Sequence, residues 1–323
     1  MPSPRAALTH YHPALGTMFQ LDDMANRAGF IWNRVAPVVE ADQQNGTFGK
    51  IPIKQLLKEP EVGRGARGDY NRTNFTFDEG TFSTKEKGIE IPVDDRQAKI
   101  YKEFFDFEVV CARQALSIVL RAAEKRWADA IFNATTFTSQ TTSVTNEWDD
   151  ASNATPVTDV EAAARAVWDR TGMWPNALII NRHVFRNLRL CDEVIDALHS
   201  EGAGVSIEPG KITVASLASV FDLPYIIVAG SARDSANEGQ AVSVGNVWSN
   251  EYAMVCRVAE TSDFEEPCLA RTIHWGEDGS QVGGTIESYY SDETRGTIMR
   301  VRHEVDEKIV YTEMGQLLDN ITS

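Results

Sequence analysis

The sequence predicts an α+β fold, and three observations indicate it. An amphipathic pattern typical of one long helix runs from Asp94 to about Asn133. A polar, β-type segment over residues 46–91 precedes it and has no core of its own. Short strands and helices alternate after it, which indicates a compact α/β unit. Because the segment over 46–91 cannot bury itself, we expect it to be buried on another copy of the chain.

The composition is that of a folded, soluble protein. The 323 residues allow one large or two ordinary domains, and 42% are hydrophobic and 24% charged. No apolar run reaches the roughly 18 residues that cross a bilayer, and the first residues lack a signal-peptide pattern. We therefore expect synthesis and folding in a cytoplasm.

The formal charge of −16 is unevenly distributed. Between Lys50 and Glu90, eight Lys and Arg stand against seven Asp and Glu, so this stretch carries +1 and the rest of the chain −17. An acidic body repels nucleic acid, which argues against a dedicated DNA- or RNA-binding role. The extended segment lacks the acidic surplus, so it can lie on the acidic surface of a neighbouring copy without net repulsion.

The first part of the chain predicts an arm and then a ribbon. Residues 1–45 read as an N-terminal arm with a short helix over 22–31. Residues 46–58 predict a strand at a sheet edge, because they contain Pro52. The alternation over 74–83 predicts a second strand. A two-stranded ribbon of this kind is marginal alone in water, so it needs a partner surface.

Within the ribbon, the run from Gly63 to Gly68 matches the G-x-G-x-x-G spacing of dinucleotide-binding loops. That function needs a buried strand before the loop and a helix after it, and polar residues flank this loop on both sides. We therefore predict a flexible loop tip that carries arginines. The candidate intersubunit contacts are two cations that pair with acids of a neighbour and three apolar side chains: Arg64, Arg67, Phe75, Phe77 and Phe82.

The long helix has a clear start. Asp94 and Gln97 have the spacing of a capping box. Apolar residues follow at steps of three or four, which keeps one face apolar: Phe105, Val109, Ala112, Leu116, Val119, Ala123, Trp127 and Ile131. Unbroken, such a helix is about 60 Å long. The alternative is an ordinary core helix split near Ser117.

A second folded unit begins after a Thr-, Ser- and Asn-rich linker over 134–157. Thr158 and Glu161 read as the capping box of a helix that ends at Gly172. Buried strands are expected at 177–180, 225–228 and 253–258, helices at 182–190, 192–200 and 213–221, and a loop at 232–238. From about Thr272 the chain turns β-rich: an alternating strand over 297–305, paired with 309–311, is expected to return to the long helix.

Several stretches, in their order along the chain, resemble the major capsid protein of tailed bacteriophages, which has the Hong Kong 97-like fold. They are Ile91–Arg96, Ala122–Ala128, Trp148, Pro156–Val160, Thr171–Leu178 and Ala236–Gly239. The resemblance extends over about residues 15–323. It implies an N-terminal arm (1–45), an extended β-hairpin called the E-loop (46–91), a peripheral domain with a long spine helix (92–157), an α/β axial domain (158–270) and a β-rich return to the peripheral domain (271–323).

The resemblance also implies a function. Proteins of this family are structural, not enzymes, and assemble as hexamers and pentamers into the icosahedral head of the virion, which encloses DNA without reading its sequence. Assembly takes place in the host bacterial cytoplasm. Separate scaffolding, portal or decoration proteins are the expected partners, because the segment before the ribbon is too short for a fused scaffold. Some relatives cross-link an E-loop lysine, but no lysine here matches that motif.

We predict no catalytic, cofactor-binding or metal-binding residues. The four cysteines form no C-x-x-C pair and read as free thiols packed as small apolar groups. His10 and His12 could hold a metal on a strand, but a mobile terminus is the simpler interpretation. No H-E-x-x-H, G-x-S-x-G or Walker pattern occurs. Three alternatives stay open: an encapsulin-like nanocompartment shell, an α/β enzyme within 158–260, and a phage head-decoration or tail protein.

Overall fold

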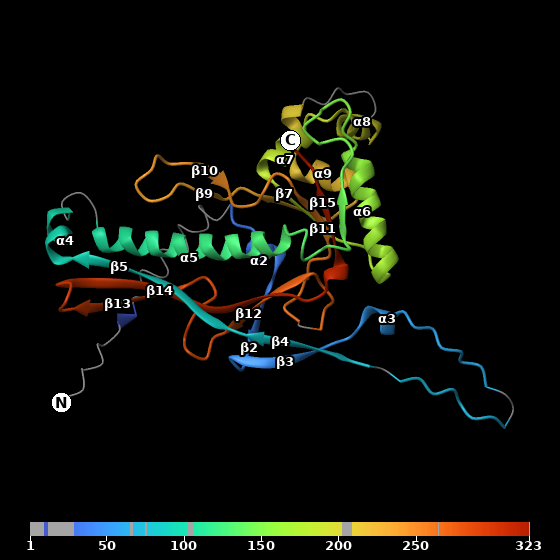
Figure 1. Cartoon of the computed structure of the whole chain (residues 1–323), viewed down its shortest axis with the longest axis horizontal. Coiled ribbons are helices and arrows are strands. Elements are labelled where there is room, and N and C mark those ends of the chain that lie inside the picture. Colours follow the sequence, from blue (N-terminus) through green and yellow to red (C-terminus); the bar gives the residue numbers. More distant parts are fainter. Residues whose placement is uncertain are drawn as a thin grey trace.

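A computed structural model of the chain describes residues 10–11, 29–64, 67–74, 76–101, 106–201, 209–263 and 265–322. One long helix lies along a twisted sheet and forms an elongated layer (Figure 1). A compact unit of helices around a second sheet stands at one end of this layer. A hairpin arm extends away from both parts on the same side as that unit.

The first sheet is built around the long strand β14 (Gly296–Ile309). One edge of β14 pairs with β5 (Lys85–Asp94), and the other edge pairs with β13 (Thr285–Ser291) and then with β12 (Ala270–Trp275). Two short strands complete the sheet, β1 (His10–Tyr11) beside β13 and β2 (Val38–Ala41) parallel to β12. The strand predicted over 297–305 is confirmed. Residue 309 continues it and does not belong to a partner strand, as we had expected.

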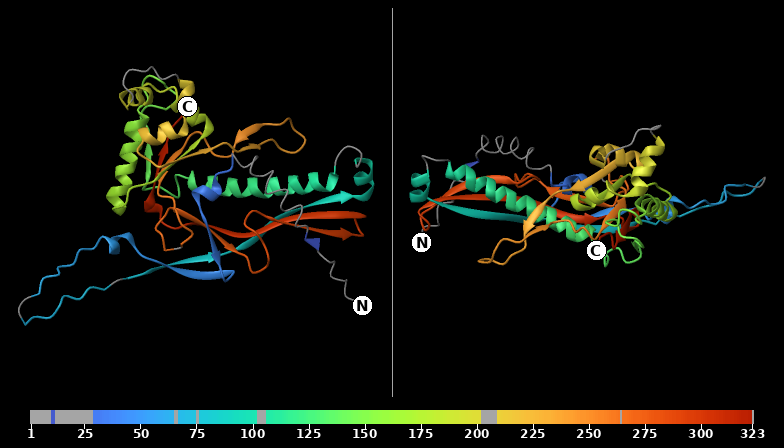
Figure 2. Two further views of the ribbon diagram at one scale, coloured as in Figure 1. Left: turned by 180° about the vertical axis from the view of Figure 1, so that it is seen from behind. Right: turned by 90° about the horizontal axis from the view of Figure 1, so that it is seen from above.

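The alternation along β14 places its apolar residues on the helix side. Met299, Val301 and Val305 are all at most 2% exposed, and His303 shares their face at 1%. Side chains alternate between the two faces of a strand, so this pattern buries one face against the long helix. The same sheet therefore supports the helix along much of its length, as Figure 2 shows from two further sides.

The prediction of one unbroken helix from Asp94 is wrong. The strand β5 runs to Asp94, the short helix α4 (Asp95–Tyr101) follows, and the long helix α5 (Phe107–Ile131) starts anew. Asp94 is a cap, since its Oδ1 accepts the backbone N–H groups of Arg96 and Gln97 at 2.7 and 3.2 Å. Asp106 caps the second start by accepting the N–H of Val109. The 25 residues of α5 make it about 37 Å long.

The apolar face predicted for α5 is confirmed. Its buried residues include most of those predicted, namely Ala112, Leu116, Val119, Ala123, Trp127 and Ile131. Phe105 lies outside the described residues. Hydrophobic side chains at steps of three and four form a stripe along one face of a helix, and here the stripe packs on β14 and β5. The helix is not split near Ser117.

The second sheet is buried on both faces. Its strands, in spatial order, are β6 (Thr141–Ser143), β15 (Gly315–Asp319), β11 (Ala253–Cys256), β7 (Ala177–Asn181) and β8 (Tyr225–Ala229). Alternate residues of β7 enter different cores: Ile179 joins the core around α5, and Leu178 and Ile180 join the core beneath the other helices. Burial on both faces explains why these strands appear in the sequence as continuous apolar runs. The three predicted strands are confirmed.

The C-terminal strand β15 belongs to this second sheet, where it pairs with β11 and β6. The expectation that the whole end of the chain returns to the first sheet is therefore wrong for residues 315–319. The strand carries Leu317 into the core around α5 and Leu318 into the helix-covered core. It ties the two cores together at the end of the chain.

Four helices flank the second sheet: α6 (Pro156–Thr171), α7 (Arg182–Leu188), α8 (Asp192–Glu201) and α9 (Val214–Val220). Thr213 caps α9 in a capping box with Ser216, as the sequence indicated for its start. The capping box predicted at Thr158 is wrong, since α6 begins at Pro156. Glu193 of α8 supplies the acceptors there, from the N–H of Val157 at 2.7 Å and the hydroxyl of Thr158 at 2.8 Å.

Several smaller elements occur in the described residues. The loop predicted over 232–238 is wrong for its first three residues, which form β9 (Ala232–Asp234). This strand pairs with β10 (Val244–Asn246) in a hairpin that projects from the α/β unit. The helix α2 (Trp32–Val35) precedes β2, while most of the helix predicted over 22–31 lies outside the described residues. His10 is paired in β1, so the interpretation as a mobile terminus does not hold there, and His12 is not described. Single 3₁₀ turns occupy Pro209–Lys211 and Thr312–Met314.

Candidate intersubunit surface

The root of the projecting hairpin is a short two-stranded sheet of β3 (Asn45–Lys50) and β4 (Asp78–Ser83). The two predicted strands of the ribbon are thus confirmed only near the root, because β3 ends at Lys50 and β4 begins at Asp78. Glycines opposite the aromatic residues make room for them. A Cβ on Gly46 would lie 2.8 Å from the ring of Phe82, and one on Gly80 would lie 2.2 Å from the ring of Phe48.

A buried junction separates this root from the first sheet. Thr84 is 2% exposed and lies between β4 and β5. Its hydroxyl lies within hydrogen-bonding distance of the Gln44 carbonyl oxygen (3.2 Å) and the Glu304 carboxylate (3.1 Å). Residues 85–91, which we had included in the ribbon, belong instead to β5 of the first sheet.

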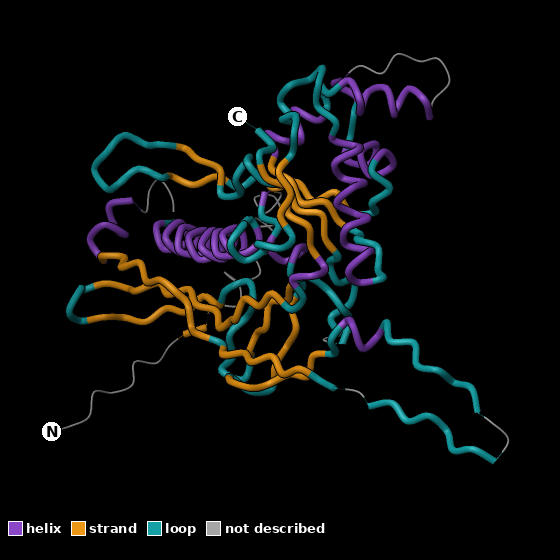
Figure 3. The backbone as a smooth tube through the Cα atoms, turned by 45° about the vertical axis from the view of Figure 1, so that its right-hand side comes forward, coloured by secondary structure: helices purple, strands orange, loops and turns teal. Residues whose placement is uncertain are grey.

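Between the two root strands, residues 51–77 form what we call the hairpin arm. Figure 3 shows its two limbs as extended loop, apart from the short helix α3 (Ile53–Leu56), leaving the body of the molecule. Hydrogen bonds join one limb to the other, from Asn71 Nδ2 to the Glu61 carbonyl oxygen (2.9 Å) and from Gln55 Nε2 to Thr76 Oγ1 (2.8 Å). The two limbs are therefore held by hydrogen bonds to each other and not by packing on a hydrophobic core.

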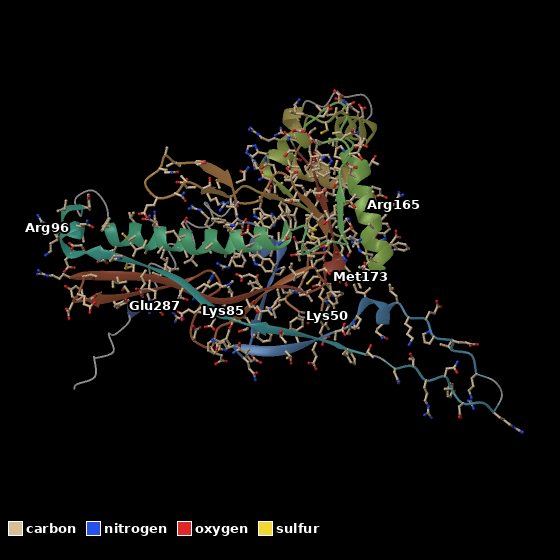
Figure 4. The ribbon with its side chains drawn as sticks, viewed as in Figure 1. Lys50, Lys85, Arg96, Arg165, Met173 and Glu287 are labelled. Carbon is tan, nitrogen blue, oxygen red and sulfur yellow. The ribbon has the colours of Figure 1, made fainter. Side chains whose placement is uncertain are left out.

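The arm is fixed to its own molecule at the root. Tyr311, which follows β14, donates its hydroxyl to the Ile51 carbonyl oxygen (3.1 Å), and the Lys50 ammonium lies 4.4 Å from the centre of its ring. Leu57 reaches the left-handed turn at Gly172, at the end of α6, where a Cβ would lie 2.8 Å from the leucine methyl. Figure 4 places Lys50 where the arm leaves the body and Met173 close to that turn.

Several large apolar side chains of the arm are largely in solvent. Leu57 is 55% exposed, Phe77 67%, Tyr70 71% and Val62 88%. Full burial of such a side chain is worth about 1.5–3 kcal/mol. Of these four, the sequence interpretation named only Phe77. Isolated apolar residues within a polar segment were the signal for the other three.

The predicted contact residues divide into two groups. Arg64 and Arg67 are exposed at the arm tip. Arg64 donates to the Gly68 carbonyl oxygen at 2.6 Å and stacks 4.7 Å from the centre of the Tyr70 ring, so its guanidinium is held in place. Phe82 is half-buried at the root against its own chain, which gives it an intramolecular role. Phe75 lies outside the described residues.

A charged cluster fixes β5 beneath the long helix. Glu307 of β14 accepts from Arg126 Nε of α5 at 2.7 Å and forms an ion pair with Lys87 of β5. Burial raises the pKa of the Glu307 carboxyl, but the bond from Lys87 and the charge of Arg126 outweigh it and leave the pKa below its ordinary value. An ionised Glu307 therefore joins the helix to both strands.

His303 extends this cluster as a neutral ring. Its Nδ1 lies 3.2 Å from the Val282 carbonyl oxygen, which can only accept, and its Nε2 lies 3.4 Å from a guanidinium nitrogen of Arg126, which can only donate. These partners require a proton on Nδ1 and a lone pair on Nε2. Burial, together with the nearby charges of Arg126 and Lys87, lowers the pKa of His303 to about 4.

Two phage proteins are similar to this chain in sequence. Over 297 residues the chain is 24% identical to the major capsid protein of Pseudomonas phage JBD67. This alignment covers 90% of this chain and 91% of the relative. The chain is also 24% identical, over 206 residues, to the major capsid protein of Burkholderia phage BcepMu, covering 62% of this chain and 64% of the relative. This chain is a major capsid protein of tailed phages. No protein-family profile matches it.

Solved structures agree with the capsid protein in fold. A phage-related protein from Bordetella bronchiseptica superposes with a TM-score of 0.69 at 18% identity. The superposition covers 98% of this chain and 99% of the Bordetella protein. The capsid of cyanophage P-SCSP1u gives 0.58 at 12% identity, with coverage of 91% and 89%. The SrpI encapsulin of Synechococcus elongatus gives 0.51 at 12%, with coverage of 91% and 89%. The α+β fold is thus that of phage capsid structures. The sequence relative from phage JBD67 is the ground for the role as a structural component of the virion.

Proposed function

We propose that the protein assembles head to tail into hexamers and pentamers, and that these close into the icosahedral shell that encloses the phage DNA. Each subunit lays its hairpin arm on the next subunit of the ring. A contact between two different faces of the same chain closes into a ring when its rotation fits, and leaves a free pair of faces when it does not.

One observation carries this proposal: the hairpin arm exposes Val62, Tyr70 and Phe77 while it leaves its own molecule. Exposed apolar side chains do not stabilise a monomer, whereas a neighbour that covers them removes apolar area from water and stabilises the contact. The arm is also built to persist in this form, since its limbs bond to each other and Arg64 stacks on Tyr70.

Charge supports the same arrangement. The stretch from Lys50 to Glu90 is close to neutral while the rest of the chain is strongly acidic. Arg64 and Arg67 at the tip then meet the acidic surface of a neighbour, and we assign them the role of intersubunit contacts, together with Phe75 and Phe77. The acidic body also suits a container that does not bind the DNA it holds, because tight binding would oppose packing.

In the terms of the capsid fold, we propose that the E-loop comprises the hairpin arm with its root strands, that α5 is the spine helix, and that the α/β unit is the axial domain around the ring axis. The E-loop then ends with β4 at Ser83, because residues 85–91 belong to β5 of the first sheet, and we keep 45, 157 and 270 as the proposed limits of the other parts. Scaffolding, portal or decoration proteins encoded separately complete the head in the host cytoplasm.

An encapsulin shell shares this fold, so fold alone does not separate the two functions. The sequence relatives that cover most of the chain are phage capsid proteins, which favours the head shell. Electron microscopy of the protein expressed alone tests the proposal: rings or closed shells are expected. Replacing residues 58–76 by a short glycine turn should leave folded subunits that no longer close. Normal shells from that variant would refute the role of the arm.

A further inference from the structure

Two tryptophans form an exposed stacked pair on the α/β unit. Trp168 lies in the last turns of α6 and is 44% exposed, and Trp174, just beyond the left-handed turn at Gly172, is 53% exposed. Their ring centroids are 5.7 Å apart with 25° between the planes. Trp174 is also held by its backbone, because Arg257 donates to its carbonyl oxygen at 3.3 Å. The pair is therefore a fixed apolar surface.

A pocket continues this surface. It has a volume of about 220 Å³ and is walled by Trp174, Ala164 and Phe221. Glu161 and Asp222 line it as well, and Glu161 is paired with Arg165 at 2.7 Å. Ala164 and Trp168 follow Glu161 at steps of three and four, so the three residues share one face of α6. An apolar centre with a charged rim is the usual construction of a protein–protein contact.

The β9–β10 hairpin also carries exposed apolar side chains on the same unit. Val242, just before β10, is 73% exposed, and Val244, the first residue of β10, is 75% exposed. The Asp234 carboxylate accepts the N–H groups of Ala236 and Ser243, both at 2.9 Å. The hairpin thus has internal support, although a two-stranded ribbon is marginal without a partner.

The β9–β10 hairpin and α6, the helix that carries Trp168, lie on opposite sides of the α/β unit. In Figure 1 the β9–β10 hairpin projects from one side of the α/β unit and α6 forms the other side, and the reverse view in Figure 2 agrees. A head-to-tail ring places one side of each subunit against the opposite side of the next. Resting on the head-to-tail ring of the proposed function, we propose that Val242 and Val244 of one subunit pack on the Trp168–Trp174 surface of its neighbour.

Engineered disulfides test the pairing. The four native cysteines are buried, so a pair introduced on the surface reacts selectively. In shells of the Trp174→Cys/Val244→Cys variant, oxidation should link subunits head to tail and give a ladder of covalent oligomers on a non-reducing gel. Each single variant should stay monomeric on that gel. The matched control pair is Leu190→Cys/Val244→Cys, since Leu190 is 54% exposed on the same unit but away from the pocket, and it should give no ladder.

The competing occupant of the tryptophan surface is the arginine tip of the arm. A ladder from Trp174→Cys/Arg64→Cys, with none from Trp174→Cys/Val244→Cys, would overturn the inference in favour of the arm. Closed shells without a ladder from either pair would overturn it as well, while the proposed function would stand. Failure of the wild-type chain to form rings or shells would remove both.

A measurement on the wild-type protein covers the case in which Trp174→Cys prevents assembly. Of the tryptophans in the described residues, Trp168 and Trp174 are the two most exposed, since Trp275 is half-buried and the others are buried. In dissociated subunits, acrylamide should therefore quench mainly the fluorescence of this pair. Assembly should protect the pair from quenching, and Val242→Ser/Val244→Ser should slow the appearance of this protection. Quenching that is the same in subunits and shells would contradict the inference.

Discussion

The carboxylate of Glu124 accepts a hydrogen bond from the indole nitrogen of Trp248 at 2.6 Å inside the core. It also accepts the backbone N–H groups of Ile31 and Trp32, both at 3.0 Å, and lies 3.3 Å from the Ser231 hydroxyl. Glu124 belongs to α5, Ile31 and Trp32 are the N-cap and the first residue of α2, and Trp248 and Ser231 belong to the α/β unit. One side chain thus joins three segments that lie far apart in the sequence.

The first prediction concerns this junction. Glu124→Met keeps most of the volume but leaves three buried N–H donors without an acceptor, and each such loss costs about 1–3 kcal/mol. We expect the free energy of unfolding to fall by about 3 kcal/mol or more in urea titrations of the purified subunit. Glu108→Met, at an exposed position in the first turn of the same helix, should cost less than about 1 kcal/mol. Equal losses in the two variants would contradict this account.

The second prediction concerns pH. Because the pKa of His303 is about 4 in the folded protein and about 6.5 when unfolded, the unfolded state binds the proton more readily. The stability that the neutral ring contributes is present above pH 6.5 and is lost as the pH falls toward 4, by at most about 3 kcal/mol. His303→Gln should show a shallower loss of unfolding free energy between pH 6.5 and 4.5 than the wild type. His183→Gln, which changes an exposed histidine, should follow the wild-type profile.

The third prediction compares two glycines in strands. A Cβ on Gly296 would lie 2.1 Å from the carbonyl oxygen of Val93 in the paired strand β5, whereas a Cβ on Gly49 would meet nothing within 4 Å. The neighbour of Gly296 is backbone, so it cannot yield without disturbing the β5–β14 ladder. Gly296→Ala should lower the urea midpoint by the equivalent of about 2 kcal/mol or more. Gly49→Ala should stay within about 0.5 kcal/mol of the wild type.

The fourth prediction separates assembly from folding. Val62→Ser combined with Phe77→Ser changes side chains that are 88% and 67% exposed in the single subunit. Its melting temperature should therefore stay close to that of the wild type, while the yield of closed shells in sedimentation should fall strongly. Leu190→Ser, at a 54% exposed leucine outside the arm, should leave both unchanged. A melting temperature that falls in step with the shell yield would mean that the arm serves folding.

The parts of the fold that depend on local periodicity could be predicted from the sequence. The apolar face of α5, the strand β7 and the cap at Thr213 were all predicted, because steps of three and four, continuous apolar runs and a capping hydroxyl act within one segment. The division of the long helix was missed. Its sign was Asp106, a capping residue in the middle of an otherwise helical pattern.

The remaining misses depend on tertiary partners. The start of α6 is set by Glu193, which lies in another helix, and the place of β15 is set by its pairing with β11. Of the candidate site, the exposed tip with Arg64 and Arg67 followed from its glycines. The Trp168–Trp174 pair did not, because the turn at Gly172 brings the two rings together and sequence distance does not reveal it.

The junction at Thr84 has a mechanical consequence. It joins a strand embedded in the main sheet to a separate two-stranded root, which Tyr311 also holds through the Ile51 carbonyl oxygen. A small rotation at this junction would displace the tip of the arm far more than it would disturb the sheet. In the assembly proposed above, rings of five and of six need different angles between adjacent subunits, and such a rotation would let the same arm fit both.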